Sequence, residues 1–392
     1  MADHAHGRNR SKSNASSVLQ RLSRDFEDSH PHEGLMAAAS DVASTILSGH
    51  PQPEEQPLTH AATQTEKQAE DSISTPQPSS DGGATRVPST EKTTAAVVPN
   101  PAPIGSTTEP FSNGYHFPPK YPFKEATIQG LKDFWKFFTT PWGFFWTIYG
   151  ANIVAWGGML FLLLCNASPA MCYPTCDDIN SPRRKWIEWD SQILTGLFCV
   201  TAFGLAPWRF RDLYFLMMYR VWGDKDGLRR LGGIHNGWFR LPGTQQLDVL
   251  VGPDNIPGDV PQSCVPIPEK NMPPAPLTGT RAPATAVWKL DFVIWCMVMN
   301  TFAQCALCGI MWGMNRYDRP SWTTGFLVAI ACVIAMVGGL EMFLEGKKVK
   351  GIEGVPLTER DRERLARDGE LGIPHYNNLK DAKPKEKGKG EK

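Results

Sequence analysis

Four runs of uncharged, mostly apolar residues dominate the chain after residue 140, at 142–165, 191–208, 292–315 and 320–340. The hydrocarbon core of a bilayer is about 30 Å thick, and a helix of roughly 20 apolar residues crosses it. Because a backbone inside lipid must satisfy its own hydrogen bonds, such runs form helices. The pattern predicts an all-α, polytopic membrane protein whose four transmembrane helices lie in a membrane domain over 123–345.

A shorter amphipathic pattern precedes the first run. One helical face is apolar and the other is mostly charged, the apolar residues being Ile128, Leu131, Phe134, Trp135 and Phe138. This pattern is typical of a helix that lies in the membrane interface. Thr140 and Pro141 then supply a cap and a first-turn proline for the first transmembrane helix.

The same pattern predicts the loops and the C-terminal part. The second helix is expected to continue past its apolar run and bend onto the membrane surface, at the start of a cytosolic loop over 209–289. Proline crowds 251–283, which is predicted to be a linker. A tail over 346–392 follows the fourth helix. Within it, a capping box at Thr358 is expected to open a short charged helix over 359–367.

Residues 1–115 are rich in Ser, Thr, Pro, Gln, Glu and Ala and poor in aromatic residues. Ordering a backbone costs about 1–2 kcal/mol per residue, which so little apolar surface does not offset, so a disordered tail is predicted. Two helical faces, one with Val18 and Phe26 and one with Leu35 and Ile46, are interpreted as fluctuating turns or as nascent helices for a partner. The first residues lack the apolar core of a signal peptide.

Charge sets the expected orientation. Lys and Arg are concentrated before the first span, in the 209–289 loop and after the fourth span. The positive-inside rule therefore places both the N and C termini in the cytosol. Arg183, Arg184 and Lys185 are an exception, because they lie on the opposite side just before the second helix.

The third predicted helix carries a polar ridge beside a ridge of small residues. The first contains Asn300, Gln304 and Cys308, and the second contains Thr301, Cys305, Gly309 and Gly313. Small residues let helix backbones approach closely and amides hydrogen-bond across the contact, which favours a helix-packing face. A polar lining for a substrate or ion path, and thiol chemistry at Cys305 and Cys308, are the alternatives. No Asp, Glu, Lys, Arg or His lies within the four runs, which disfavours a proton-driven transporter.

Cys172 and Cys176 lie in the loop between the first two helices, on the side opposite to the termini. If that side faces an oxidising compartment, a disulfide across the turn is expected. Two free thiols are the second interpretation. A metal site with Asp177 or Asp178 is the third, and the lack of a nearby His disfavours it. No cofactor-binding motif occurs in the chain, and no cofactor is predicted.

Basic residues of the loop after the second helix are candidate contacts for anionic lipid headgroups, namely Arg209, Arg211, Arg229, Arg230 and Arg240. Each such contact contributes on the order of 1 kcal/mol. The alternative is that cytosolic loops beside a membrane are basic because the topology requires it. A role in nucleic-acid binding is disfavoured, because these residues stay close to the membrane.

The sequence offers no specific catalytic motif, and a non-enzymatic protein is predicted. His235 lies in a Gly-rich, aromatic turn and is interpreted as docking that turn under the bundle. Glu188 and Asp190 flank Trp189 at the mouth of the second helix and are interpreted as marking the interface. Lipid chemistry through His235 or Asp190 is the alternative.

Several longer motifs resemble a known family. They lie at 141–160, 176–183, 204–214 and 232–243. They are similar to a fungal family of multi-pass membrane proteins known as domain of unknown function 2985, over 123–345. The resemblance implies a eukaryotic integral membrane protein of the plasma membrane or an endomembrane, and it transfers no catalytic or binding residues.

These features predict a membrane scaffold or regulatory subunit. The bilayer is one partner, and the Ser/Thr-rich N-terminal tail is expected to recruit protein partners or to be modified. Assembly into a homo-oligomer is left open. The alternative from another class is a homo-oligomeric channel or facilitator lined by Asn300 and Gln304, and an interfacial lipid-acting enzyme is the third.

Overall fold

The structure is a computed structural model that describes Phe26, Ser29 and residues 108–383. The predicted disorder of 1–107 lies outside the described residues, apart from those two positions, and so does the end of the chain from residue 384. In the described part the fold is all-helical, with no β-strand, which confirms the predicted fold class. The helices are α3 (Phe123–Phe138), α4 (Pro141–Leu164), α5 (Pro182–Val221), α6 (Lys225–Ile234), α7 (Val287–Gly313), α8 (Ser321–Glu353) and α9 (Glu359–Glu370).

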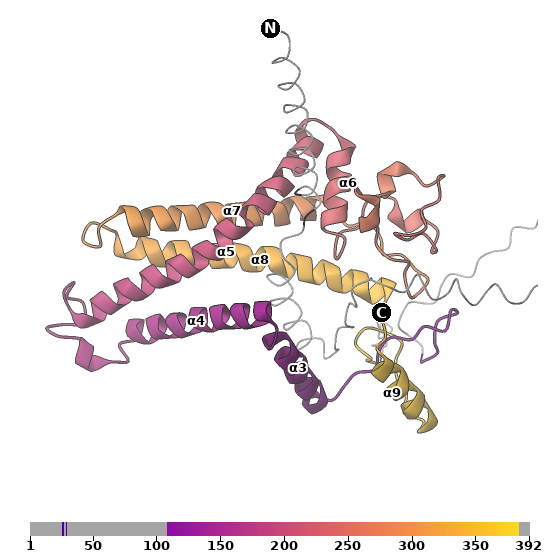
Figure 1. Cartoon of the computed structure of the whole chain (residues 1–392), viewed down its shortest axis with the longest axis horizontal. Helices are drawn as coiled ribbons and strands as arrows, with labels where there is room; N and C mark the ends of the chain where they lie inside the picture. The colour runs from indigo at the N-terminus through magenta and orange to yellow at the C-terminus, as the bar shows by residue number, and fades with distance from the viewer. Residues whose placement is uncertain (1–25, 27–28, 30–107, 384–392) are drawn as a thin grey trace, which may run out of the picture.

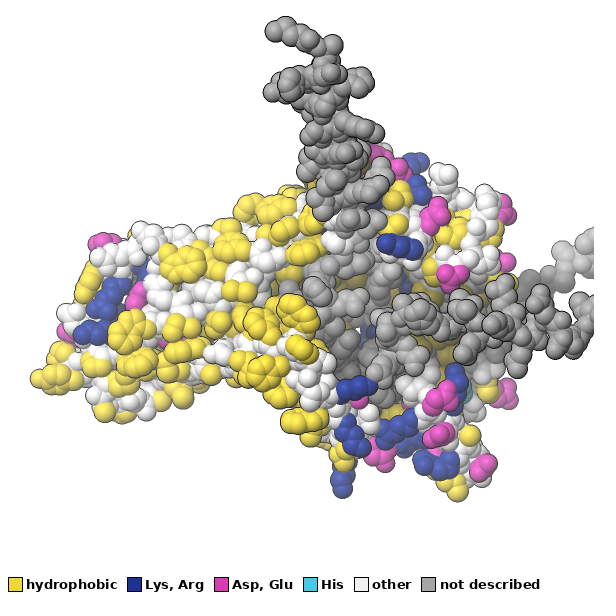
Figure 2. All heavy atoms as spheres, viewed as in Figure 1, with side chains coloured by type: hydrophobic (Ala, Val, Ile, Leu, Met, Phe, Trp, Pro, Cys, Tyr) yellow, Lys and Arg dark blue, Asp and Glu magenta, His cyan; other side chains and the backbone are white. Residues whose placement is uncertain are grey.

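Four of these helices, α4, α5, α7 and α8, are long and apolar enough to cross a membrane. They form an elongated bundle in which α7 packs against both α5 and α8, and α4 packs mainly against α5 (Figure 1). On the face shown in Figure 2, charged side chains gather at the two ends and leave an apolar band between them. We call the end with α6, α9 and residues 108–122 the terminal side. The end with loops 165–181 and 314–320 is the hairpin side.

Two long helices extend beyond their predicted apolar runs. α5 begins at Pro182, after Ser181 accepts a hydrogen bond from Arg184 N at 3.3 Å, and it continues through Pro207 to Val221 without breaking where the charges begin. α8 continues to Glu353. Hydropathy marks the apolar part of a helix, whereas packing at its ends decides how far the helix continues.

A buried apolar core on the terminal side explains these extensions. It joins the end of α5, α6, the turn after α6 and the start of α7. Its buried members are Phe215, Leu216, Leu228, Leu231, Trp238, Phe239, Leu241, Leu290, Val293 and Ile294. The last turns of α5 therefore belong to a packed domain at the end of the bundle.

The Pro-rich segment 251–283 is packed against this region and is not an extended linker. Val251, Cys264 and Met272 are buried, and short 3₁₀ turns occur along the segment. Arg281 folds back and donates a hydrogen bond to Asp248 O at 3.0 Å. Proline excludes regular structure here, but it does not exclude burial once side chains satisfy the carbonyl groups.

Parts of both predicted tails fold together. Residues 108–122 lie against residues 354–383, where Tyr115 Oη donates to Val355 O at 2.8 Å and accepts from Val355 N at 2.9 Å. The disorder predicted for 1–115 is therefore wrong for 108–115, the continuous part of that range that the structure describes. Each segment alone lacks the apolar surface to fold, and the pair supplies it.

Candidate functional site

A line of polar side chains runs along the contact between α5 and α7, and we call it the polar seam. It consists of Cys199, Arg209, Asn300, Thr301, Gln304 and Cys308. Arg209 Nη1 donates to Asn300 Oδ1 at 2.9 Å and to Thr301 Oγ1 at 2.8 Å. Asn300 Nδ2 donates to Ala331 O of α8 at 2.9 Å. The seam therefore ties three of the long helices together through buried polar groups.

The middle of the polar seam contains two thiols and an amide. Cys199 Sγ and Cys308 Sγ lie 2.6 Å apart, and both side chains are buried. Gln304 is 5% exposed, and its Oε1 has no hydrogen-bond partner within the described residues. The thiols lie between helices and away from water, where a reactive thiolate is disfavoured.

The ridge of small residues on α7 is partly buried and partly exposed. Thr301 is buried in the polar seam, whereas Cys305, Gly309 and Gly313 are exposed. A Cβ added at Gly309 or Gly313 would meet no atom within 4 Å. The predicted packing face thus divides into a buried seam and an exposed strip of small residues. Helical spacing places both on α7, but it does not show which flank the neighbouring helices cover.

A second polar group closes the α5–α7 contact on the hairpin side. Gln192 Nε2 donates to Met311 O at 2.9 Å and to Glu188 Oε1 at 2.9 Å. Glu188 also forms an ion pair with Arg319, which precedes α8. Glu188 therefore links α5 to the α7–α8 loop, in addition to lying near the end of the bundle.

Asp190 is buried, whereas the sequence suggested that it marks the membrane interface. It is 0% exposed, and neither carboxylate oxygen has a hydrogen-bond partner in the described part of the chain. It lies about two helical turns from Arg183, hence on the face of α5 that contacts α4. Glu188 lies on a different face, so the two carboxylates do not form an acid–base pair. The exposed neighbour Trp189 made this segment look interfacial in the sequence.

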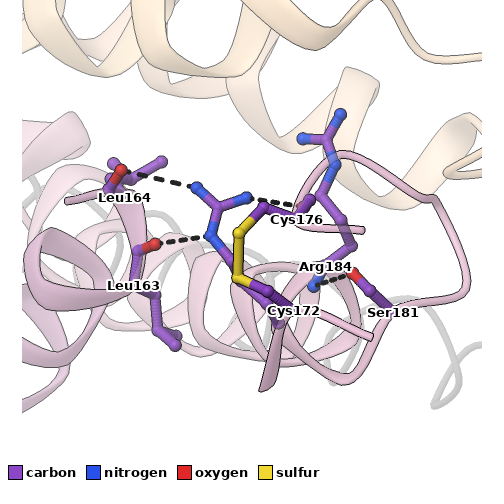
Figure 3. The surroundings of a disulfide bond; sticks show 7 residues. Leu163, Leu164, Cys172, Cys176, Ser181 and Arg184 are labelled. Carbon is purple, nitrogen blue, oxygen red and sulfur yellow. Dashed lines mark hydrogen bonds between the residues drawn. A yellow bond between two sulfur atoms is a disulfide. The ribbon is translucent and has the colours of Figure 1, made fainter. Parts of the chain in front are cut away.

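The loop between α4 and α5 is closed by a disulfide between Cys172 and Cys176 (Figure 3). Arg183 donates to Leu163 O at 2.7 Å and to Cys176 O at 3.0 Å. Its guanidinium therefore joins the free carbonyl end of α4 to the disulfide loop, which neutralises part of the helix dipole. This explains one of the basic residues that disagreed with the charge rule. Between residues 108 and 383, no group of three or more metal-ligating side chains is close enough to hold a metal.

A cavity of about 420 Å³ lies beside this loop. Met159 and Leu163 of α4, Met171 of the loop and Trp186 of α5 contribute to its lining, which is almost entirely apolar. No local sequence pattern predicts it, because residues of α4, the loop and α5 line it together. It faces the hairpin side of the bundle.

The arginines predicted to contact lipid have partners inside the chain. The partners are Asp212 for Arg211, Glu353 for Arg240, Asp226 and Val265 O for Arg229, the Phe215 ring for Arg230, and the polar seam for Arg209. Arg211 and Arg240 are each less than a tenth exposed. These side chains therefore contribute to folding of the terminal side. The sequence did not reveal this, because their partners are mostly distant along the chain.

His235 contacts α5 from the turn after α6. Its Nε2 lies 3.4 Å from Asp212 Oδ2, and its ring centre lies 5.6 Å from that of Trp238. The contact docks the Gly-rich turn against α5. His235 lies on the terminal side and Asp190 toward the hairpin side, so the fold does not bring these two residues into one site.

Residues 108–122 and 354–383 form a second folded unit, which we call the terminal assembly. α9 begins at the capping box predicted at Thr358 and ends at Glu370. Tyr121 Oη donates to Asp361 Oδ1 at 2.8 Å, and Arg364 lies 4.6 Å from the Tyr121 ring centre. Burial raises the pKa of Tyr115 to about 12. The assembly therefore holds the two ends of the membrane domain together.

His375 joins two carboxylates in the terminal assembly. Its Nδ1 lies 2.7 Å from Asp381 Oδ2, and its Nε2 lies 3.1 Å from Asp368 Oδ2. The His375 hydrogen bond, followed by the contact with Arg367, lowers the pKa of Asp368. Burial alone would raise the pKa of Asp381. Hydrogen bonds from Lys120 N, His375 and Tyr376 N outweigh burial and lower this pKa.

The fold and these contacts define a class: a helical protein with four helices able to cross a membrane, a polar seam between them and a folded assembly at one end. Residues 136–219 match the family described as "Protein of unknown function (DUF2985)". This confirms the predicted resemblance over a shorter stretch than 123–345. The matched stretch is the α4–α5 hairpin with its disulfide loop, Arg183, Asp190 and Arg209. No curated protein and no solved structure matches the chain.

Proposed function

We propose that the protein is a non-enzymatic membrane scaffold or regulatory subunit. The supporting observation is that Arg209 hydrogen-bonds to Asn300 and Thr301, at 2.9 and 2.8 Å. These are polar groups that a path through the bundle would use, and here they hold α5 to α7. The bundle is then an anchor, and binding falls to the terminal assembly and to the Ser/Thr-rich residues 1–107.

We further propose that the terminal side faces the cytosol. The contact of residues 108–122 with 354–383 brings both ends of the membrane domain to one side, as an even number of crossings requires. Lys and Arg are concentrated on that side, in agreement with the positive-inside rule. The disulfide of Cys172 and Cys176 lies on the hairpin side, which fits a non-cytosolic, oxidising compartment.

A homo-oligomeric channel is the second candidate. The exposed strip of Cys305, Gly309 and Gly313 suits close contact with a helix of another copy. Asn300 and Gln304, however, are buried inside the chain's own bundle. A contact through the strip would not place these amides along a path between subunits, so the scaffold has more support.

An interfacial enzyme has the least support. His235 has a carboxylate neighbour in Asp212, but its Nε2 has no hydrogen bond from a hydroxyl or thiol nucleophile among the described residues. Asp190 has no hydrogen-bond partner there to act with it. Neither residue therefore has the second group that acid–base or nucleophilic catalysis requires.

Comparing partners of the full chain with those of a variant lacking residues 1–107 tests the scaffold proposal. Both proteins are expressed at matched levels, extracted in mild detergent and analysed by quantitative mass spectrometry. We expect specific proteins to accompany the full chain and to be lost with the truncated one, and each should bind again when purified. Ion flux into liposomes by the purified chain, with no protein that depends on the tail, would reject the scaffold in favour of the channel.

A further inference from the structure

Two residues from the N-terminal segment contact α5 near the end of its apolar run. The ring centres of Phe26 and Trp208 lie 6.1 Å apart, and the guanidinium carbon of Arg211 lies 6.0 Å from the Phe26 ring centre. Trp208 Nε1 donates to Ser29 Oγ at 3.0 Å. Arg211 Nη1 donates to Phe26 O at 3.2 Å and also to Ser29 O.

The chemistry of the two surfaces is complementary. On α5, an indole N–H and a guanidinium present donors only. Phe26 and Ser29 present backbone carbonyl groups and a hydroxyl oxygen, together with an aromatic ring. Ser29 N and Ser29 Oγ both donate to Phe26 O, at 3.2 and 2.8 Å, which holds these two residues close together. Arg211 adds a further donor to Phe26 O and supplies one to Ser29 O.

Arg211 is built into this contact. Its side chain is 4% exposed, and its second partner is Asp212 at 3.0 Å. Asp212 pairs with the guanidinium on α5, and Arg211 Nη1 reaches the carbonyl groups of Phe26 and Ser29. The Phe26 ring contacts both the Trp208 ring and the Arg211 guanidinium, so the site binds through aromatic contacts as well as hydrogen bonds.

We propose that Trp208 and Arg211 form a receptor site for the N-terminal segment of the same chain, occupied by Phe26 and Ser29. Because the segment belongs to the same chain, its effective concentration is high and modest contacts suffice to hold it. A protein that recognises Phe26 and Ser29 competes with α5. This inference holds whether or not the protein is a scaffold.

Photo-crosslinking in the full-length protein, reconstituted in lipid nanodiscs, tests the occupant. Phe26 is replaced by p-benzoyl-phenylalanine, and unlabelled chains are mixed with isotopically heavy chains. We expect a crosslink from position 26 to a peptide of α5 that contains Trp208, within one chain. The same probe at Phe123, which is 82% exposed, is the control and should not reach α5. Crosslinks only to other peptides, or only between light and heavy chains, would overturn the proposal.

A double-mutant cycle tests the specific hydrogen bond. Ser29→Ala and Trp208→Phe each remove one partner, and the second keeps an aromatic ring in place. Each should lower the crosslinking yield about fivefold, the effect of one neutral hydrogen bond, and the double variant should show little further loss. Independent, multiplying losses would contradict a direct Ser29–Trp208 bond. Ser29→Ala lies outside the bundle, so it remains informative if Trp208→Phe impairs folding.

Discussion

At the scale of single residues, Arg209 and Arg240 each connect segments that lie far apart in the chain. Both belong to the basic loop that follows the apolar run of α5. In the structure Arg209 reaches back to Asn300, and Arg240 pairs with Glu353 at 2.7 Å. A helical pattern shows the direction of each side chain, but it does not show which acceptors of distant segments lie there.

We expect Asn300→Leu to destabilise the bundle. The change removes an acceptor of Arg209 and the side-chain donor to Ala331 O, at a cost of about 1–3 kcal/mol. Reversible unfolding in mixed micelles measures the difference. Met299→Leu is the matched control, because Met299 is 46% exposed and one residue away. Equal stability of the two variants would show that the polar seam does not hold the helices together.

Gly227 is required by the close approach of α6 to α5. A Cβ at this position would lie 2.5 Å from Phe215 O, a backbone atom that cannot rotate away. Gly227→Ala should therefore lower the unfolding temperature, with a loss of about 1–3 kcal/mol from overpacking. Gly237→Ala serves as the control, since a Cβ there meets no atom within 4 Å. An unchanged unfolding temperature in the first variant would contradict this packing.

At the scale of elements, periodicity predicted the regular helices and failed for the irregular segments. The apolar runs formed α4, α5, α7 and α8, and the amphipathic segment formed α3. Lipid favours apolar residues all along a helix that crosses it and along one face of a helix that lies at its surface. Segment 251–283 has no such period, and it is held by isolated bonds such as that from Arg281 to Asp248 O at 3.0 Å. Contacts of this kind depend on the arrangement of the whole fold, so no local pattern announces them.

The ion pair of Arg240 with Glu353 joins the turn after α6 to the end of α8. Glu353 Oε1 also accepts from Ala282 N at 3.0 Å, so one carboxylate holds two segments. Arg240→Gln should cost about 3–5 kcal/mol, because it leaves a mostly buried carboxylate without its cation. Arg362→Gln breaks an exposed pair with Glu359 and should cost under about 1 kcal/mol. Comparable unfolding free energies would refute this difference.

The last segment of the terminal assembly should depend on pH. Folding lowers the pKa of Asp368 and of Asp381 below their ordinary value of 3.8. The stability that these two carboxylates contribute is therefore present above pH 3.8 and is lost as the pH falls through their lower pKa values in the folded state. Hydrogen exchange of residues 371–383, corrected for intrinsic rates, should show protection at neutral pH that disappears below about pH 4. His375→Ala should reduce the protection already at neutral pH. Protection that persists in acid would contradict the role of these carboxylates.

At the scale of the whole molecule, the α4–α5 hairpin matched by the family at 136–219 contains parts of each feature that organises the fold. It carries the disulfide loop on the hairpin side, Arg209 in the polar seam and the docking surface at Arg211. The sequence identified the four helices and the family resemblance. It did not reveal the burial of Asp190, the apolar cavity or the terminal assembly, because each depends on how separate segments pack together.

We propose that the bundle is an anchor for protein partners and not a path across the membrane. Native mass spectrometry of the detergent-extracted full chain distinguishes the two, because it reads subunit number and retained companions together. We predict a monomer or dimer that carries another protein. A closed ring of identical subunits with no companion protein would reject the anchor and favour a pore.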